Sequence, residues 1–163
     1  MRCRFPMTAF ALTASLLALP SSSFAETSSS SDFKVLAREQ GGFNVSAVQE
    51  LLDKGDEAVA SGDLAEAREH FDNARKVSKQ LLSFYRDLSG AFRGLDARIP
   101  REMDSKGRRT LTLLAQSNLR LAALFRRQDQ PEIAVPLLVE VVRLTTPSNK
   151  EGQNAYQSLI ELG

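Results

Sequence analysis

The chain has 163 residues, with 21 Lys and Arg, 20 Asp and Glu, one His and one Cys, and a formal net charge of +1. A balance this close to neutral disfavours general nucleic-acid binding, which depends on an excess of basic side chains that neutralise phosphates. So few histidines and cysteines also exclude the common His/Cys metal sites and most nucleophile–base pairs. We therefore expect no cofactor, no nucleic-acid partner and no enzymatic activity.

Residues 1–25 have the layout of a secretory signal peptide. Two basic residues, Arg2 and Arg4, precede the apolar segment "TAFALTASLLAL", and small residues lead up to Ala25. The apolar segment has 12 residues, whereas a helix that crosses a bilayer needs about 20. We expect cleavage after Ala25, which would also remove Cys3, the only cysteine. The alternative is an uncleaved anchor or a buried helix.

A Ser-rich stretch, residues 26–43, follows the leader and contains the segment "ETSSSSD". Such a sequence has too little apolar surface to bury, so we interpret it as a flexible spacer. Over residues 44–163 the apolar residues recur every three or four positions, which is the period of an amphipathic helix, and no run alternates as a strand does. The sequence therefore predicts an all-α domain of about five helices over residues 44–163.

The stretch "SGDLAEAREHFDNA", residues 61–74, reads as the turn and second helix of a helical pair that starts near Val48. Small residues and one large residue recur there at fixed spacing: Gly55, Ala58, Gly62, Ala67, Phe71 and Ala74. This pattern resembles the tetratricopeptide repeat (TPR), a helix–turn–helix unit of about 34 residues. The resemblance implies that Gly55 lets the two helices approach and that Phe71 fills their crossing.

A second, weaker match to the repeat starts at Ala115. The residues at its pattern positions are Ala122, Phe125, Asp129, Ala134, Leu138 and Val141. Pro131 suits the first position of the following helix, where its missing N–H costs nothing, whereas Pro136 should kink that helix. Capping boxes are expected at the helix starts marked by Asp63 with Glu66 and by Ser148 with Glu151. The last of these helices would cover the end of the stack.

Between the two matches, the sequence predicts a long central antiparallel helical hairpin in place of a middle repeat. An apolar stripe with steps of three and four residues, interrupted only at Ser78, continues through Leu81, Tyr85, Leu88, Phe92, Leu95 and Ile99. Without a strong breaker before Pro100, we expect one continuous helix from about Leu64 to Arg98 and a second long helix beyond it. The alternative is a third ordinary repeat with a break near Gly90 to Gly94.

In tetratricopeptide folds the first helix of each repeat lines a concave groove, so the resemblance implies a set of groove residues. These are Gln49, Leu52, Asp56, Val59, Gln116, Leu119, Arg120, Ala123, Arg126 and Arg127. Arg120 resembles the arginine of carboxylate-clamp repeats, but the companion Asn and Lys positions are not matched. A second basic group surrounds the turn of the hairpin: Arg98, Arg101, Lys106, Arg108 and Arg109. The alternative for each of these residues is a solvated helix face.

Three functions are compatible with these features. The first is an exported, non-enzymatic scaffold that binds a protein partner, such as an assembly or stability factor for a membrane complex. The second is a peripheral adaptor that binds anionic lipid through the basic turn of the hairpin. The third, which we favour least, is a carboxylate-based hydrolase that uses Glu66 or Glu69. His70 lies one turn from Glu66, and we interpret this pair as an exposed helix-face contact.

The C-terminal sequence adds a hint about location. The segment "RRQDQPEIAVPLLVEVVRLTTPSNKEGQNAYQSLIELG" resembles small exported helical proteins of cyanobacteria. The resemblance implies the thylakoid lumen as a destination, besides the periplasm that the leader already suggests.

Overall fold

The computed structural model describes residues 43–163. The predictions of a cleaved leader over residues 1–25 and of a flexible spacer over residues 26–43 lie outside this range, apart from Phe43. Helices account for most of the described chain, and this part contains no strand, so the all-α prediction is confirmed. The helices are α2 (Val45–Ser61), α3 (Leu64–Ala91), α4 (Arg98–Arg127), α5 (Pro131–Thr145) and α6 (Lys150–Ile160).

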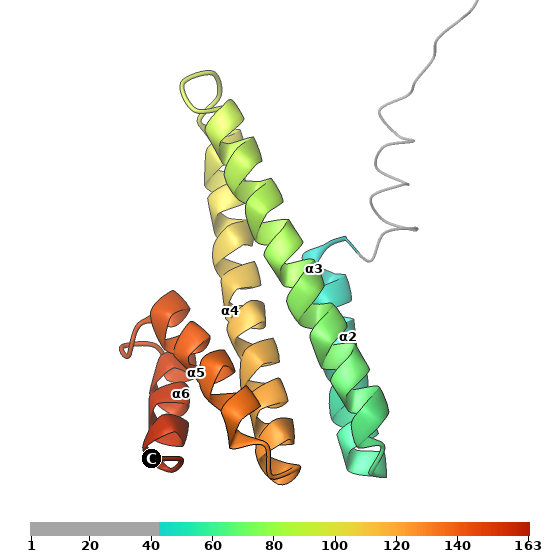
Figure 1. Ribbon diagram of the computed structural model, residues 1–163. Coiled ribbons are helices and arrows are strands. Elements are labelled where there is room, and N and C mark those ends of the chain that lie inside the picture. The colour runs from blue at the N-terminus through green and yellow to red at the C-terminus, as the bar shows by residue number, and fades with distance from the viewer. Residues whose placement is uncertain (1–42) are drawn as a thin grey trace, which may run out of the picture.

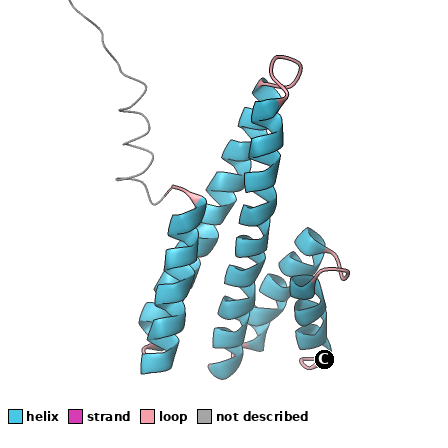
Figure 2. Cartoon of the chain, turned by 180° about the vertical axis from the view of Figure 1, so that it is seen from behind, coloured by secondary structure: helices cyan, strands magenta, loops and turns pink. Residues whose placement is uncertain are grey.

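Each helix packs against the next one along the chain, and the long α3–α4 hairpin stands at the centre (Figure 1). α2 covers one side of this hairpin, and the α5–α6 pair covers the other. α4 also contacts both α2 and α6, whereas α3 and α5 make no direct backbone approach. Helices α2, α4 and α6 therefore share one face, which we call the inner face; Figure 2 shows it toward the viewer.

The ends of the first helical pair follow from local chemistry. The Asn44 side chain accepts a hydrogen bond from the Ala47 N–H at 2.8 Å and starts α2. Gly62 ends α2 with φ at 90°, a left-handed conformation that suits glycine. The Asp63 carboxylate then accepts a hydrogen bond from the Glu66 N–H at 2.9 Å. The predicted cap at Asp63 is therefore confirmed, but the other half of the capping box does not form, because the Asp63 N–H donates to the Ala58 carbonyl instead of to Glu66.

The crossing of α2 and α3 depends on one small and one large residue. Phe71 is only 1% exposed, and its ring lies directly against Gly55. A Cβ at Gly55 would overlap the ring, so the glycine is required for the close approach of the two helices. The prediction that Phe71 fills this crossing is confirmed.

The second helical pair, α4 and α5, buries the residues that the second match singled out. Ala122, Phe125, Ala134, Leu138 and Val141 are each less than 5% exposed. The intervening turn places Asp129 at φ 55°, and Pro131 occupies the start of α5 as predicted.

The start of α6 differs from the prediction. Its N-cap is Asn149 and no side chain caps it, so the predicted capping box of Ser148 with Glu151 is wrong. The reason lies in the packing before the helix. Thr146 turns the chain with φ at 60°, and Gly152 on α6 contacts the Thr146 carbonyl so closely that a Cβ would clash with it. This backbone contact, rather than a capping side chain, positions α6.

The central hairpin is present, but the predicted continuous helix from Leu64 to Arg98 is wrong at its end. α3 stops at Ala91, and residues 92–97 form the turn before α4 starts at Arg98. Gly94 has φ at 90° within this turn, and a second glycine, Gly90, weakens the last turn of α3. A Cβ built at either glycine would have no neighbouring atom within 4 Å, so neither glycine is required by a close helix contact. The alternative of a third ordinary repeat does not form either, since α3 and α4 run side by side to the turn (Figure 1).

The far end of the hairpin, residues 86–109, extends beyond the other helices, and we call it the hairpin tip (Figure 1). α2 begins beside Phe84, where the Phe43 ring packs edge-on at 5.7 Å between ring centroids. Past this level α3 and α4 have only each other as neighbours. Met103 and Ser89 are the buried residues of the tip, whereas the rest of the described chain, the body, holds the remainder of the core.

Candidate functional site

The inner face gathers most of the predicted groove residues, and several of them bind side chains of the neighbouring helix. The Arg120 guanidinium binds both carboxylate oxygens of Asp56, with contacts of 2.7, 2.8 and 3.0 Å. This pair joins α4 to α2 across 64 positions of sequence. The arginine that resembles a carboxylate clamp is thus occupied by a carboxylate of its own chain.

Two further contacts join α4 to α6 on the same face. Gln116 donates a hydrogen bond to Glu151 at 3.3 Å, and Arg126 binds Glu161 at 2.9 Å. An ion pair near the surface, such as Arg126 with Glu161, typically contributes 0 to about 1 kcal/mol. The larger effect of these contacts here is to fix the direction of long side chains along the inner face.

The remaining predicted groove residues behave differently from one another. Gln49 donates a hydrogen bond to Asp53 within α2, at 2.9 Å. Leu52 is 0% exposed and belongs to the core, so its assignment to the groove surface is wrong. Arg127 is exposed and has no ion pair among the described residues. It is the predicted groove residue with a charge still available to a partner.

A small hollow lies between α2 and α4, where Asp56, Arg120 and Arg127 meet. Its volume is about 140 Å³, and apolar groups line the rest of it: Val59, Phe71, Ala123 and Leu124. The hollow is large enough for one small aliphatic side chain. Arg127 lies at the same hollow, so a carboxylate next to that side chain would find a cationic neighbour.

The hairpin tip is the second candidate site, and it contains Arg101, Lys106, Arg108 and Arg109 as predicted. Lys106 pairs with Glu102 at 2.7 Å, and Arg98 pairs with Asp96 at 3.1 Å. The hydrogen bonds from Arg98 also hold the pKa of the partly exposed Asp96 carboxyl below its usual range. The other three predicted residues, Arg101, Arg108 and Arg109, are exposed and have no ion pair within residues 43–163.

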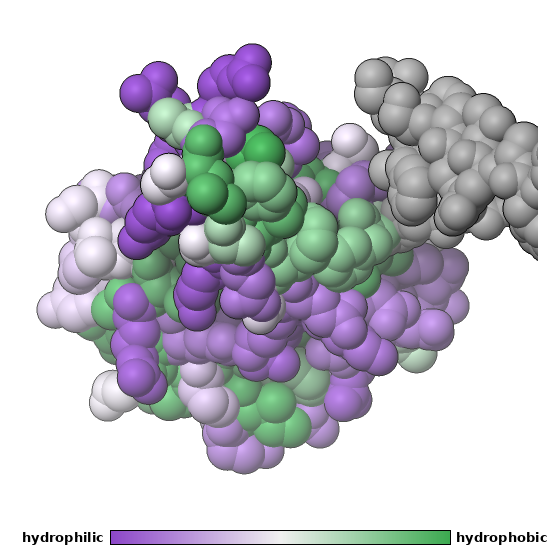
Figure 3. All heavy atoms as spheres, turned by 90° about the horizontal axis from the view of Figure 1, so that it is seen from above, coloured by the Kyte–Doolittle hydropathy of each residue, from purple (hydrophilic) through white to green (hydrophobic). Residues whose placement is uncertain are grey.

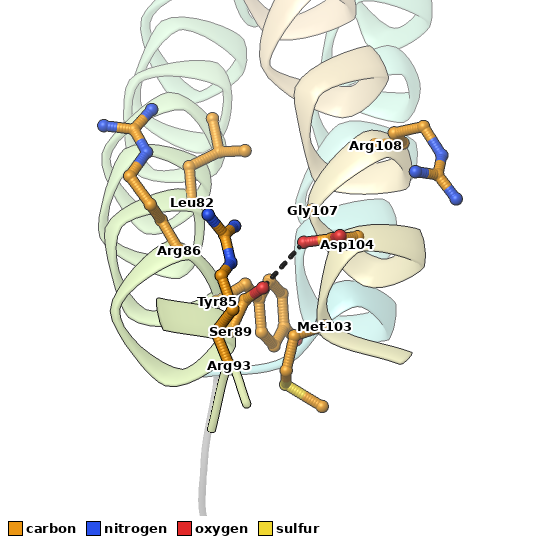
Figure 4. Close-up of a pocket in the computed structure, with 9 residues that line it drawn as sticks. All are labelled: Leu82, Tyr85, Arg86, Ser89, Arg93, Met103, Asp104, Gly107 and Arg108. Atoms are coloured by element: carbon orange, nitrogen blue, oxygen red, sulfur yellow. Dashed lines mark hydrogen bonds between the residues drawn. The ribbon is translucent and has the colours of Figure 1, made fainter. Parts of the chain in front are cut away.

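Two arginines of the tip were missed from the sequence. Arg86 and Arg93 come from α3 and the turn, and the antiparallel pairing with α4 places them at the same hollow as Arg108 (Figure 4). This hollow measures about 290 Å³. The basic group predicted from the sequence contained residues of α4 alone. The seven-residue spacing of Arg86 and Arg93, two helical turns on one face, was the signal that could have revealed them.

The base of this hollow is partly polar. The Ser89 hydroxyl donates a hydrogen bond to Asp104 at 2.9 Å, as the dashed line in Figure 4 marks. Asp104 is the only carboxylate that lines the hollow. Burial raises the pKa of the neighbouring Tyr85 phenol, and the charge of Lys106 offsets part of this effect. The phenol is therefore neutral at physiological pH and contributes no charge of its own.

A third polar cluster ties the outer side of the body together. Arg75 donates to Asn118 and to Glu140, both at 2.7 Å, and Lys79 binds Glu140 at 2.7 Å. Burial by itself would raise the pKa of Glu140, but the hydrogen bonds and charges of Arg75 and Lys79 outweigh it and lower that pKa. The cluster joins α3, α4 and α5, and its contacts indicate a structural role.

The predicted acid–base pair has the geometry of a helix-face contact. His70 Nε2 lies 3.5 Å from Glu66 Oε1, and the Glu66 side chain is 58% exposed. Glu69 is exposed on the same helix. In the described part of the chain, no group of three or more His, Cys, Asp or Glu residues is arranged to hold a metal ion. A hollow of about 530 Å³ lies beside the pair, but it is open to solvent, and Lys54, Glu57, Ala58 and Ser61 line the rest of it.

Comparisons with protein-family models, with curated proteins and with solved structures gave no match for this chain. Among residues 43–163, no helix combines the length and apolar character that crossing a membrane requires. We base the proposals on the inner face and the hairpin tip.

Proposed function

We propose that this protein is an exported, non-enzymatic scaffold with TPR-like helical hairpins, which binds a protein partner on its inner face. The pairing of small and large residues at both helix crossings supports the TPR-like interpretation. Gly55 faces Phe71 in the first pair, and Ala122 and Leu138 are both buried in the second. The leader over residues 1–25 supports export to the periplasm or the thylakoid lumen.

The observation that carries the proposal is the hollow between α2 and α4. It combines an apolar base with one unpaired arginine, whereas the neighbouring Arg120 is already held by Asp56. A pocket with few, well-placed polar groups gives orientation, while its apolar lining gives affinity. We therefore expect the partner to insert an aliphatic side chain and to place an acidic residue next to Arg127.

A pull-down from native membranes with the tagged protein tests this proposal. Two charge reversals are compared, Arg127→Glu at the hollow and Lys76→Glu on the exposed side of α3. Neither residue has an ion pair in the described part of the chain, so the two variants are matched in the change of charge and in exposure. We expect partners captured by the wild type to be lost with Arg127→Glu and retained with Lys76→Glu. Retention of every partner by both variants, or equal loss from both, would contradict the proposal.

A further inference from the structure

The hairpin tip differs in charge from the body. Residues 86–109 contain seven basic and four acidic residues, a net charge of +3. The rest of the described chain contains ten basic and thirteen acidic residues, a net charge of −3. Because the tip extends beyond the other helices, the positive charge is concentrated at one end of an elongated molecule (Figure 1).

Most of the basic side chains of the tip are available to a partner. Within residues 43–163, Arg98 and Lys106 are the only basic residues of the tip that bind a carboxylate. The five others have no ion pair among the described residues, and all are exposed: Arg86, Arg93, Arg101, Arg108 and Arg109. Figure 4 shows that three of them do not converge, since Arg86 and Arg108 point outward from opposite helices with Arg93 between them. Such an array suits a surface with many separate phosphates better than one small anion.

The turn at the apex of the tip, residues 92–97, carries one strongly exposed apolar side chain beside two charged ones, Arg93 and Asp96. Leu95 is 80% exposed, more than any other large hydrophobic residue in the described part of the chain. It follows Gly94 in the turn, and Phe92 and Ile99 lie partly buried on either side. Viewed from above, toward the hairpin turn, an apolar area lies among strongly hydrophilic side chains (Figure 3).

We propose that the hairpin tip docks onto an anionic lipid bilayer, with the arginines at the level of the lipid phosphates and Leu95 inserted beyond them. Leu95 stands in the turn of the hairpin between Arg93 and Arg98, and the other basic residues follow on both helices, so the same end of the molecule offers an apolar side chain and several cations to a bilayer. A purely acidic segment would neutralise the arginines but would leave Leu95 in water. The negative body would be repelled by the same bilayer, which would hold the hairpin upright on the surface. This inference does not depend on the inner face.

Vesicle flotation tests the proposal with the protein as isolated from its host and with variants purified in the same way. The vesicles contain phosphatidylcholine alone or phosphatidylcholine mixed with phosphatidylglycerol, each at low and at high salt. We expect binding to the mixed vesicles only, with a loss at high salt. Each basic residue near an anionic surface contributes roughly a five-fold change in partitioning. Reversal of Arg108 and Arg109 to Glu should therefore reduce binding by at least roughly 25-fold.

Two further variants separate a bilayer site from a general charge effect. Leu95→Ser should weaken binding severalfold without changing its salt dependence, because the leucine contributes burial and no charge. The control is the double variant Lys54→Glu and Lys76→Glu, which reverses two exposed, unpaired lysines of the body and should bind as the wild type does. Absence of wild-type binding to mixed vesicles would overturn the proposal. So would equal losses in the tip and body double variants. Competition by soluble polyglutamate together with an unchanged Leu95→Ser would assign the tip to an acidic protein instead.

Discussion

The inner face of the body and the hairpin tip both carry arginines, but these arginines have different surroundings. On the inner face, Arg120 and Arg126 bind carboxylates of adjacent helices. At the tip, Arg101, Arg108 and Arg109 have no such partner within the described residues, because α3 and α4 have no third helix beside them there. Packing thus gives Arg120 and Arg126 partners on adjacent helices, whereas the arginines of the free hairpin mostly face outward; Arg127 is the exception on the inner face.

The same contrast applies to the apolar residues. In the body, Leu52, Phe71 and Leu138 are at most 1% exposed, whereas Leu95 at the tip is 80% exposed. The free energy of folding therefore comes mainly from the body, and the tip can change its sequence at little cost in stability. A segment with few buried contacts is also the part of a fold that opens most easily.

The largest expected effect on this comparison is that of Phe71→Ala. Truncation of a buried phenylalanine costs about 3–5 kcal/mol through lost burial and a residual cavity. The matched change at the tip, Leu95→Ala, should alter the free energy of unfolding by less than about 0.5 kcal/mol, because its side chain is already in water. Urea melts of both variants measure the difference. A loss below about 1 kcal/mol for Phe71→Ala would show that the α2–α3 crossing does not depend on its ring.

A smaller effect is expected where backbone meets backbone at α6. Gly152→Ala would place a Cβ against the Thr146 carbonyl, which belongs to the backbone and cannot rotate away. Forcing extra volume into such a contact typically costs about 1–3 kcal/mol. Gly90→Ala is the matched control in the tip, where no atom lies within 4 Å of the added Cβ. The control should gain up to about 1 kcal/mol from the better helix propensity of alanine.

Thermal or urea melts of the two glycine variants read out the sign of each change. Opposite signs would confirm that α6 is positioned by close backbone contact while the end of α3 is open to solvent. If Gly152→Ala were more stable than the wild type, the contact between α6 and the Thr146 turn would have room for a Cβ.

The helices and their crossings could be predicted from the sequence because they depend on local spacing. The period of the apolar residues predicted α3 and α4. The resemblance to the tetratricopeptide repeat predicted the contact between Gly55 on α2 and Phe71 on α3. The end of α3 could not be predicted in this way. The apolar stripe continues in sequence through Leu95 and Ile99, but a helix face forms only where a neighbour buries it, and no helix covers Leu95.

The candidate sites were predicted only in part, for a similar reason. Arg120 could be assigned to the inner face from its repeat position, but its pairing with Asp56 joins residues 64 positions apart and depends on how α2 and α4 pack. Arg86 and Arg93 were missed because their place beside Arg108 depends on the register of the hairpin. Capping also showed the limit of local rules, since Asp63 caps α3 while packing at Gly152 overrides the signal at Ser148.

The smallest expected effect concerns the outer cluster of the body, and it is visible as a dependence on pH. The contacts from Arg75 and Lys79 lower the pKa of Glu140 in the folded protein. The unfolded chain therefore binds a proton at Glu140 more readily, with a pKa of about 4.3. Stability from this group is fully present above that value and is lost as the pH falls through the lower, folded-state pKa.

Glu140→Gln should remove this contribution. We expect a loss of up to about 1 kcal/mol at neutral pH, where the wild-type carboxylate is charged and paired. The difference between wild type and variant should shrink as the solution is acidified below the unfolded-state pKa, because the wild-type carboxyl then becomes protonated as well. Urea melts of both proteins at neutral and acidic pH measure this difference in the free energy of unfolding. Glu102→Gln, which breaks an exposed pair with Lys106 at the tip, is the matched control. If both variants lost the same free energy of unfolding, the Glu140 carboxylate between α3 and α5 would contribute no more to stability than the Glu102 carboxylate on the hairpin tip.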